Sequence, residues 1–211
     1  MALRTKPSVV VVFTGDGKGK TSAAIGLACR ALGAGRRVAF VQFIKSWEVS
    51  EHKFFAKIAP LFNEKISRKS ASVAAENSAA AREKFVFYKG GKGFFHAGAD
   101  SAKNRKNGAT ISDAEHEAAA RATFDFAKTC AAGGEFDLVV CDEINNAVAD
   151  GLLSRDDLKD LIVSRNAQTS LCLTGRNWAR ELDDRADIIT EMTKVKHHYD
   201  DGFLAQAGID F

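Results

Sequence analysis

The chain has 211 residues, of which 45% are hydrophobic, and a formal net charge of +3. A chain of this length supports one well-buried domain of roughly 150 to 250 residues and leaves little room for a second. No apolar signal segment opens the sequence, and no run reaches the roughly 18 apolar residues of a membrane span. We therefore exclude an integral membrane protein and expect one cytoplasmic domain over residues 1–211.

The charge is distributed unevenly along the chain. Residues 53–106 contain 12 Lys or Arg against 4 Asp or Glu, whereas the rest of the chain is mildly acidic. Such a segment is either a solvated insertion or a binding surface for a polyanion. Few aromatic residues are interleaved with the basic ones before Phe85, so we expect a solvated insertion and no nucleic-acid partner.

The four cysteines form no C-x-x-C pair, and two of them lie in apolar, strand-like runs. Small thiols pack well in such runs, so the pattern favours core thiols over a metal or redox site. These cysteines are Cys29, Cys130, Cys141 and Cys172.

The first predicted elements form a strand, helix, strand unit. Residues 9–13 are a short β-branched apolar run without alternation, as expected of a strand covered on both faces. The glycine-rich turn after it opens a helix over residues 22–32, which Gly33 ends. Residues 38–44, VAFVQFI, predict the second strand. Its polar Gln42 points into a site or lies near the strand end, and the sequence leaves both interpretations open.

The middle of the chain differs in composition. From about residue 59 to 84 it is rich in Ala, Ser, Lys and Glu, which indicates a helical excursion or a mobile insertion outside the core. We expect a short strand at residues 85–88, followed by a loop rich in Gly and Lys. This loop ends in Phe94, Phe95 and His96, which either form a binding loop or fold back onto the core.

The second half of the chain alternates helices with apolar strands. Ser112 and Glu115 form a capping box for one helix, and Ser154 caps another. Apolar strands are predicted in residues 136–143, 169–175 and 186–192. This alternation predicts a doubly wound α/β fold with a mostly parallel sheet, in which ligands bind at the carboxyl ends of the strands.

The stretch TGDGKGKTS, residues 14–22, resembles a phosphate-binding loop. The usual pattern is G-x-x-x-x-G-K-[ST], but Thr14 stands where its first glycine should be, and the glycine is displaced to Gly15. Between a buried strand and a helix, the amides of such a turn converge on an anion, and the helix N-terminus adds partial positive charge. Lys20 adds a full charge, and Thr21 is placed to offer its hydroxyl to Mg²⁺. The sequence therefore predicts phosphate binding here.

A second motif is LVVCDE, residues 138–143, an apolar strand that ends in two acids. Mg²⁺ prefers hard oxygen ligands, which Asp142 and Glu143 supply, one near the metal and one orienting a water or a ligand. Alternatively, one of these acids caps the following helix. Together with Thr21, the two acids predict the magnesium complex of a nucleoside triphosphate.

Four further groups of side chains are candidate ligands. Arg176 follows a strand at the same rim as the loop, where it can bind phosphate oxygens in a bidentate way. Arg30 lies well inside the first helix, and its position alone indicates a surface residue. Arg180 and Arg185 lie among acids and are expected to form solvated ion pairs. Adjacent His197 and His198 lack the i, i+4 spacing of a helical metal pair, so we do not expect a metal there.

At these residues the sequence resembles the P-loop ATP:corrinoid adenosyltransferases, also called cob(I)yrinic acid a,c-diamide or cob(I)alamin adenosyltransferases. The tail pattern is more diagnostic than the loop, because a generic ATPase has no reason to carry it. The matching stretches are VFTGDGKGKTSAA, RALGAGRRVAFVQFIK, VVCDEI, LTGR, ADIITEM and VKHHYDDGFLAQAGIDF.

The resemblance implies a P-loop NTPase fold of the RecA-like type and a reaction of ATP with a reduced corrinoid. The Co(I) of the corrinoid attacks C5′ of ATP and displaces triphosphate, with Mg²⁺ or Mn²⁺ as the cofactor. The resemblance also implies an external reductant, such as a reduced flavoprotein, and a homodimer. The family's loop displaces its first glycine as this chain does, and its ATP lies in the reverse sense to that in ordinary P-loop enzymes.

The resemblance also assigns roles to residues. Lys20, Glu143 and Arg176 are implied to be catalytic, and Thr21, Asp142 and Glu143 to hold the metal. Phe94 and His96 are implied to contact the corrinoid, although the family has tryptophan where this chain has His96. The residues implied to bind ATP are Gly15, Asp16, Gly17, Lys18, Gly19, Lys20, Thr21, Ser22, Arg30 and Arg176.

Two alternatives to this function remain open. One is another P-loop ATPase or a nucleoside kinase-like enzyme, which would release ADP instead of triphosphate. The other is a nucleotide-gated binding protein that has lost corrinoid chemistry.

Overall fold

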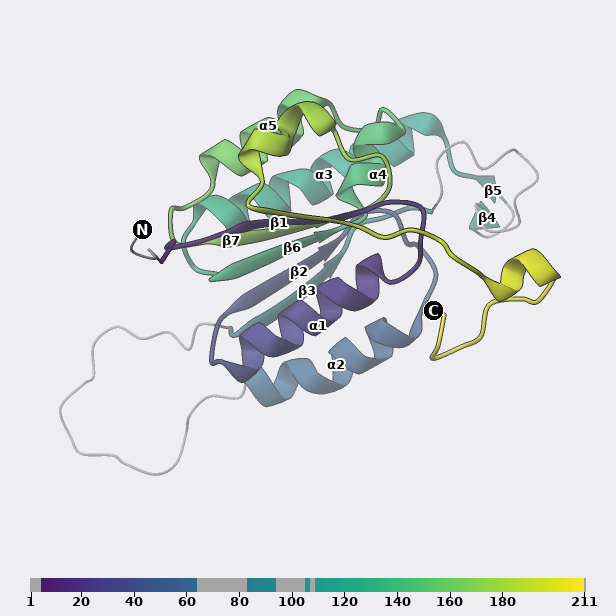
Figure 1. The fold of residues 1–211 in the computed structure, drawn as a ribbon, viewed down its shortest axis with the longest axis horizontal. Coiled ribbons are helices and arrows are strands. Elements are labelled where there is room, and N and C mark those ends of the chain that lie inside the picture. The colour runs from purple at the N-terminus through teal and green to yellow at the C-terminus, as the bar shows by residue number, and fades with distance from the viewer. Residues whose placement is uncertain (1–4, 64–82, 94–104, 107–108, 211) are drawn as a thin grey trace.

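The computed structural model describes residues 5–63, 83–93, 105–106 and 109–210. Its centre is a six-stranded sheet in the order β3-β2-β6-β7-β1-β8, and every neighbouring pair of strands is parallel (Figure 1). The strands are β1 (Val10–Thr14), β2 (Val38–Gln42), β3 (Phe85–Lys89), β6 (Leu138–Asp142), β7 (Ser170–Thr174) and β8 (Ile188–Glu191). The prediction of an α/β fold with a parallel sheet is confirmed.

Helices cover both faces of the sheet, as a doubly wound fold requires. In Figure 1, α1 (Lys20–Gly33) and α2 (Ser50–Asn63) lie below the sheet. The opposite face carries α3 (Asp113–Ala132), α4 (Ile144–Ala149) and α5 (Arg155–Ser164). Among the described residues, no helix combines the length and the apolar character needed to cross a membrane.

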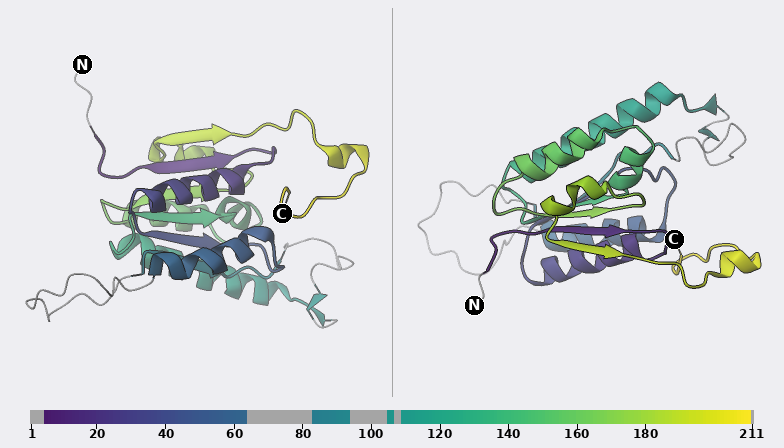
Figure 2. Two further views of the ribbon diagram at one scale, coloured as in Figure 1. Left: turned by 90° about the horizontal axis from the view of Figure 1, so that it is seen from below. Right: turned by 45° about the horizontal axis from the view of Figure 1, so that its top comes forward.

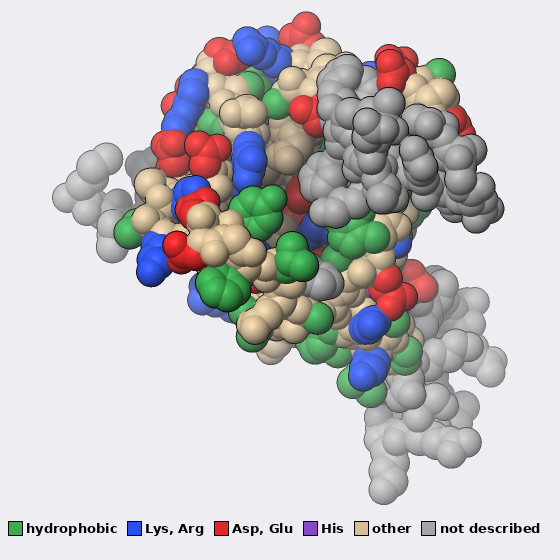
Figure 3. All heavy atoms as spheres, turned by 90° about the vertical axis from the view of Figure 1, so that its right-hand side faces the viewer, with side chains coloured by type: hydrophobic (Ala, Val, Ile, Leu, Met, Phe, Trp, Pro, Cys, Tyr) green, Lys and Arg blue, Asp and Glu red, His purple; other side chains and the backbone are tan. Residues whose placement is uncertain are grey.

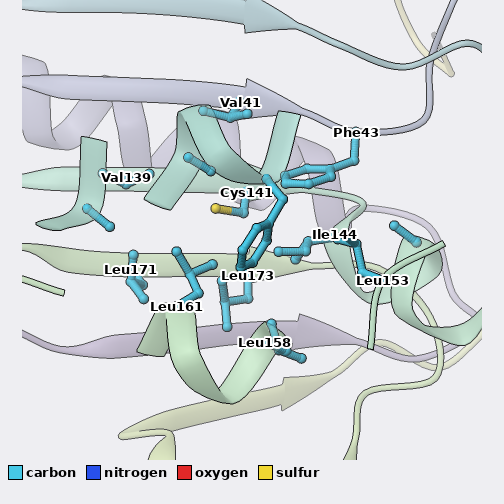
Figure 4. Packing of buried hydrophobic residues seen from close by; sticks show 14 of the residues in the cluster. Val41, Phe43, Val139, Cys141, Ile144, Leu153, Leu158, Leu161, Leu171 and Leu173 are labelled. Carbon is cyan, nitrogen blue, oxygen red and sulfur yellow. The ribbon is translucent and has the colours of Figure 1, made fainter. Parts of the chain in front are cut away.

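The core consists of two clusters, one on each face of the sheet. The larger cluster packs β6 and β7 against α3, α4 and α5, and Figure 4 shows its members Cys141, Leu173 and Leu161 close together. The smaller cluster packs β2 and β3 against α1 and α2, with Phe40 and Phe55 at its centre. Because both faces are covered, the strands carry continuous apolar runs instead of alternating ones.

Two details of the sequence prediction are corrected. The prediction placed no helix between residues 44 and 59, but α2 runs from Ser50 to Asn63 on the same face of the sheet as α1 (Figures 1 and 2), so the first five residues of the expected insertion close this helix. Residues 64–82 lie outside the described part of the chain. A short antiparallel pair, β4 (Arg105–Lys106) and β5 (Ala109–Thr110), was also not predicted.

The cysteine prediction holds for three of the four residues. Cys130, Cys141 and Cys172 are buried, and burial raises the pKa of each thiol. Cys29 is exposed on α1 and is not a core thiol, because its position on the helix faces away from the sheet.

The predicted capping box at Ser112 with Glu115 is present, and the predicted cap Ser154 forms a second capping box with Asp157. The second box also joins two helices. Asp157 accepts the backbone N–H of Ser154 at 2.8 Å and a bidentate pair of bonds from Arg121 of α3 at 2.7 and 3.0 Å. The hydrogen bonds from Arg121 hold the pKa of the Asp157 carboxyl well below its usual value.

We expect Asp157→Ala to lower the free energy of unfolding by about 1 to 2 kcal/mol, because it removes a helix cap and an ion pair together. The loss should shrink as the pH falls below about 4, where the carboxyl of the unfolded chain becomes protonated. Urea denaturation at several pH values measures this. Asp156→Ala, one residue away on α5, is the control and should change stability by only a few tenths of a kcal/mol.

Candidate active site

The glycine-rich loop joins β1 to α1 and is held against the end of β8. Gly17 donates its N–H to the carbonyl of Met192 at 2.7 Å. A Cβ atom added at Gly15 would lie 2.4 Å from the Met192 carbonyl oxygen, and one added at Gly17 would lie 2.8 Å from it. Gly15 also has a left-handed φ of 95°. Glycine is required at these two positions because β8 leaves no room for a side chain.

Lys20 and Thr21 begin α1 and face the interior of the loop. The Lys20 ammonium donates to the carbonyl oxygens of Gly15 and Gly17 at 2.6 and 2.7 Å. Burial lowers the pKa of Lys20, and the positive charge of Arg176 lowers it further. The Thr21 hydroxyl lies 3.3 Å from a carboxylate oxygen of Asp142, so the loop and the two acids meet as predicted.

Asp142 ends β6 and is completely buried. Its carboxylate accepts hydrogen bonds from Thr174 at 2.7 Å, from Gln42 at 2.9 Å and from Thr21 at 3.3 Å. The question that the sequence left open for Gln42 is thereby answered, since its side chain points into this site. Neutral donors satisfy the buried Asp142 carboxylate without a salt bridge among the described residues.

Glu143 differs from its neighbour in having a strained backbone and an unpartnered oxygen. It adopts a left-handed φ of 65°, which is uncommon for a residue with a side chain. Its Oε2 atom is buried and has no hydrogen-bond partner among the described residues. Burial, and then the charge of Asp142, raise the pKa of Glu143 to about 7. The alternative that an acid side chain caps the next helix is wrong. Glu143 occupies the N-cap position of α4, but its side chain makes no capping hydrogen bond, and Asp142 lies one residue before that position.

Arg176 follows β7 and reaches the same cavity. Its backbone N–H donates to the side chain of Asn146 at 2.7 Å, and Gly175 before it lies too close to Asn146 for a Cβ atom. Arg30 lies on an exposed position of α1 and does not line the cavity. Arg180 and Arg185 pair with Glu191 and Asp184 at the surface, as predicted.

The glycine-rich loop, Glu143 and Arg176 surround a cavity of about 620 Å³ at the carboxyl ends of the strands. Figure 3 faces this end of the molecule and shows basic and acidic side chains close together in a hollow. The predicted residues that line it are Asp16, Gly17, Lys18, Gly19, Lys20, Thr21, Ser22, Glu143 and Arg176. The lining residues for which no role was predicted are Ile25, Lys45, Ser50, Glu51, Phe54, Asn146, Thr174, Gly175, Gly208, Ile209 and Asp210.

Lys45 and Glu51 form the wall opposite the loop. The Lys45 ammonium donates to Glu51 at 2.8 Å, and only 15% and 11% of their side-chain surfaces are exposed. Burial opposes the charge of Lys45, but Asp142 and Glu143 outweigh it and raise the pKa of Lys45. The sequence offered one signal for Lys45, which directly follows the predicted strand that ends at Ile44. Glu51 lies on the unpredicted helix α2.

The C-terminal tail contributes the last part of the lining. Asp210 accepts the Lys18 ammonium at 2.8 Å, which joins the tail to the glycine-rich loop. His197, His198 and Asp210 also come together, with potential ligand atoms within 4.8 Å of one another. However, Asp210 already pairs with Lys18, and the Nδ1 atom of His197 accepts the N–H of Tyr199 at 3.1 Å. We assign no metal to this cluster.

The aromatic loop predicted at Phe94, Phe95 and His96 lies outside the described residues. The segment that leads into it is described and lies beside the end of β2. Gly93 donates to the carbonyl of Ile44 at 2.8 Å, and Gly90 donates to the carbonyl of Gln42 at 3.1 Å. The described segment therefore ends, at Gly93, beside the edge of the sheet at which the cavity lies.

A glycine-rich loop between a buried strand and a helix, with a lysine, a threonine and two acids beside it, defines a nucleotide-binding α/β protein. The model of the family described as ATP:corrinoid adenosyltransferase BtuR/CobO/CobP matches residues 6–211. The corrinoid adenosyltransferase of Escherichia coli K12 is 31% identical over 204 residues, which cover 96% of this chain and 85% of the relative. The corrinoid adenosyltransferase of Pseudomonas aeruginosa PAO1 is 32% identical over 209 residues, covering 99% and 86%.

A third relative, the corrinoid adenosyltransferase CobA of Salmonella typhimurium LT2, is 30% identical over 211 residues, covering 96% of this chain and 85% of the relative. The chain belongs to the ATP:corrinoid adenosyltransferase family. It is an enzyme that transfers the adenosyl group of ATP to a corrinoid, as the resemblance implied. These comparisons give no support to the ATPase, kinase or binding-protein alternatives.

We expect Glu143→Gln to stabilise the ligand-free protein at pH 8. The pKa of Glu143 is raised in the folded state, so its ionisation destabilises the fold as the pH rises from about 4 towards 7. The amide has no charge to bury, and a pKa unit corresponds to about 1.4 kcal/mol, so a gain of about 1 to 3 kcal/mol should appear at pH 8 and vanish near pH 4.

Thermal unfolding from pH 4 to 8 measures this difference. Glu117→Gln on the exposed face of α3 is the control and should leave the pH dependence unchanged. A gain for Glu143→Gln that is equal at all pH values would contradict the explanation by charge.

Proposed function

We propose that the cavity binds the magnesium complex of ATP and holds C5′ in line with the Co(I) of a corrinoid substrate. The observation that carries this proposal is the convergence of Lys20, Arg176 and Glu143 on one cavity beside the N-terminus of α1. Two cations and a helix N-terminus suit a triphosphate, and the acid suits the cation that accompanies it.

The reaction requires no nucleophile from the protein. The electron pair of Co(I) forms the bond to C5′, the bond between C5′ and oxygen breaks, and triphosphate leaves with the electron pair of the broken bond. Cobalt becomes formally Co(III) in the adenosylated product. The contributions of the chain are to align the reacting atoms and to stabilise the charge that develops on the leaving triphosphate.

The second contribution is assigned to the loop and to Arg176. The glycine-rich loop leads into the N-terminus of α1, and the ammonium of Lys20 lies inside the loop, against the carbonyl oxygens of Gly15 and Gly17. Arg176 is close enough to Lys20 for the two positive charges to affect each other. Binding of a polyanion between them relieves that repulsion, so both are proposed to be catalytic residues. Asp16, Lys18 and Ser22 line the same cavity and are proposed to bind ATP.

The residues around Glu143 fit a divalent cation. Its Oε2 atom is buried and unpartnered, and the Thr21 hydroxyl and the Asp142 carboxylate lie beside it. These are the hard oxygen ligands that Mg²⁺ and Mn²⁺ prefer. Thr21, Asp142 and Glu143 would therefore hold the metal, either directly or through water. When bound, the metal neutralises part of the charge on the triphosphate.

The corrinoid is proposed to lie above this cavity, with Phe94 and His96 in contact with it. Support comes from Gly90 and Gly93, which start the aromatic loop at the end of β2. Arg30 is proposed to order the loop from its position on α1, because it matches the family's stretch RALG.

The remaining proposals concern the reductant, the oligomeric state, the number of domains and the location of the enzyme. A reduced flavoprotein is proposed to deliver the electron that yields Co(I), as the family resemblance implies. A homodimer, a single domain over residues 1–211 and a cytoplasmic location, where ATP is supplied, complete the proposal.

The decisive experiment is an anaerobic assay with Mg·ATP and a chemically reduced corrinoid. The visible spectrum reports a light-sensitive adenosylated product, and chromatography identifies the phosphate that is released. We expect adenosylcorrinoid and triphosphate in equal amounts. ADP with orthophosphate would overturn the proposal.

We expect Lys20→Ala to lower kcat/KM by at least about 100-fold, because removing a charged group that stabilises the leaving group typically costs two to three orders of magnitude. The same assay measures the rate. Lys128→Ala is the matched control, since Lys128 pairs with Asp160 on the surface of α3 and α5. A near-normal rate for Lys20→Ala would remove the loop from the mechanism.

We expect His96→Trp to raise the rate with a corrinoid severalfold. An indole at this position restores the apolar crowding that the family uses, whereas an imidazole can coordinate cobalt and oppose its reduction. Rates at saturating ATP, compared with those of wild type, test this. An unchanged or lower rate would show that His96 does not limit corrinoid handling.

A further inference from the structure

A series of buried polar side chains, linked by hydrogen bonds, runs from helix α2 to Asp142. Gln42 is the last residue of β2 and is completely buried. Its side-chain N–H donates to Oδ2 of Asp142 at 2.9 Å, and its Oε1 atom lies 2.6 Å from Nε2 of His52. His52 belongs to the first turn of α2 and is itself 91% buried, with its ring 5.3 Å from that of Phe87.

The direction of each hydrogen bond in this buried series follows from His52. Its Nδ1 atom accepts the backbone N–H of Val49 at 3.3 Å, so Nε2 carries the proton in the neutral ring. That N–H donates to Oε1 of Gln42, and the amide N–H₂ of Gln42 must then face Asp142. Burial lowers the pKa of His52, which agrees with a neutral ring.

The far end of this hydrogen-bonded series is the Asp142 carboxylate, which faces Thr21. Thr174 holds one oxygen of Asp142 at 2.7 Å, and Gln42 holds the other at 2.9 Å. The contact of Thr21 with the latter oxygen is longer, at 3.3 Å. Gln42 therefore fixes the rotation of the carboxylate, and His52 fixes the orientation of Gln42.

We propose that Gln42 and His52 are positioning residues for the metal site, acting through Asp142. The proposal rests on the proposed function, in which Asp142, Thr21 and Glu143 hold the metal. Partners that orient a ligand without touching the metal typically change metal affinity by about 10- to 100-fold when they are removed. Neither residue lines the cavity, so neither touches the nucleotide directly.

A purely structural role makes a different prediction. If Gln42 and His52 only satisfied each other inside the core, replacing them would lower stability and would weaken every form of nucleotide binding alike. A positioning role affects only the part of nucleotide binding that depends on the metal. The ratio of ATP affinities with and without Mg²⁺ separates the two roles.

Calorimetric titration of the full chain with ATP, in Mg²⁺ or in excess EDTA, provides this ratio. We expect Gln42→Leu to reduce the Mg²⁺-dependent gain in affinity about tenfold, and His52→Leu to reduce it severalfold. His52→Gln should restore most of the gain, because its amide can still donate to Gln42. Affinity in EDTA should remain within about twofold of wild type for each variant.

Lys53→Ala is the matched control, because Lys53 lies next to His52 on α2 but is exposed and pairs with Glu48. An undiminished gain in both His52→Leu and Gln42→Leu would overturn the inference, as would an equal loss with and without Mg²⁺. The His52 variants keep the test valid if Gln42→Leu does not fold. A wild-type protein whose affinity is unaffected by Mg²⁺ would instead overturn the proposed metal site itself, and this inference with it.

Discussion

Two adjacent acids, the fully buried Asp142 and the partly buried Glu143, lie at the end of a central strand, and the free energy cost of removing their carboxylates from water explains much of the surrounding structure. Burial of an ionised carboxylate is unfavourable unless hydrogen bonds or opposite charges compensate for it. For Asp142 the compensation is complete, with three donors from three different segments of the chain. For Glu143 it is partial, since one oxygen has no partner within the described part of the chain and the nearby cations Lys20 and Lys45 only moderate its raised pKa. The difference leaves Glu143 as the less compensated of the two acids.

The parallel topology brings these compensating groups together. β7 lies between β1 and β6, and its Thr174 donates to Asp142 while accepting the N–H of Glu143 at 2.9 Å. One hydroxyl thus holds both acids and stabilises the left-handed backbone at Glu143. The loop after β1, the acids after β6 and Arg176 after β7 all emerge at one edge of the sheet, which is where ligands bind in doubly wound folds.

The sequence predicted the parts of this site that depend on local patterns. The loop and the strand ending in two acids each occupy a few consecutive residues, as does the capping box at Ser112 outside the site, and their spacing has a direct physical meaning. The parts that it missed depend on distant contacts. Asp210 forms an ion pair with Lys18, which lies 192 positions away in the sequence, and no local pattern predicts such a pair. Helix α2 was missed for another reason, because Pro60 interrupts its pattern near its end.

The close contact between the glycine-rich loop and β8 has a consequence for the energetics of substrate alignment. The loop is held by the backbone of Met192 and by the Lys20 ammonium, so its backbone is already fixed before any anion is present. A loop that is already ordered loses little conformational entropy when triphosphate binds. More of the intrinsic binding free energy of the triphosphate then remains to restrict the motion of the ribose. In a reaction whose nucleophile belongs to the second substrate, restricting C5′ in this way is the main means by which the protein can accelerate the transfer.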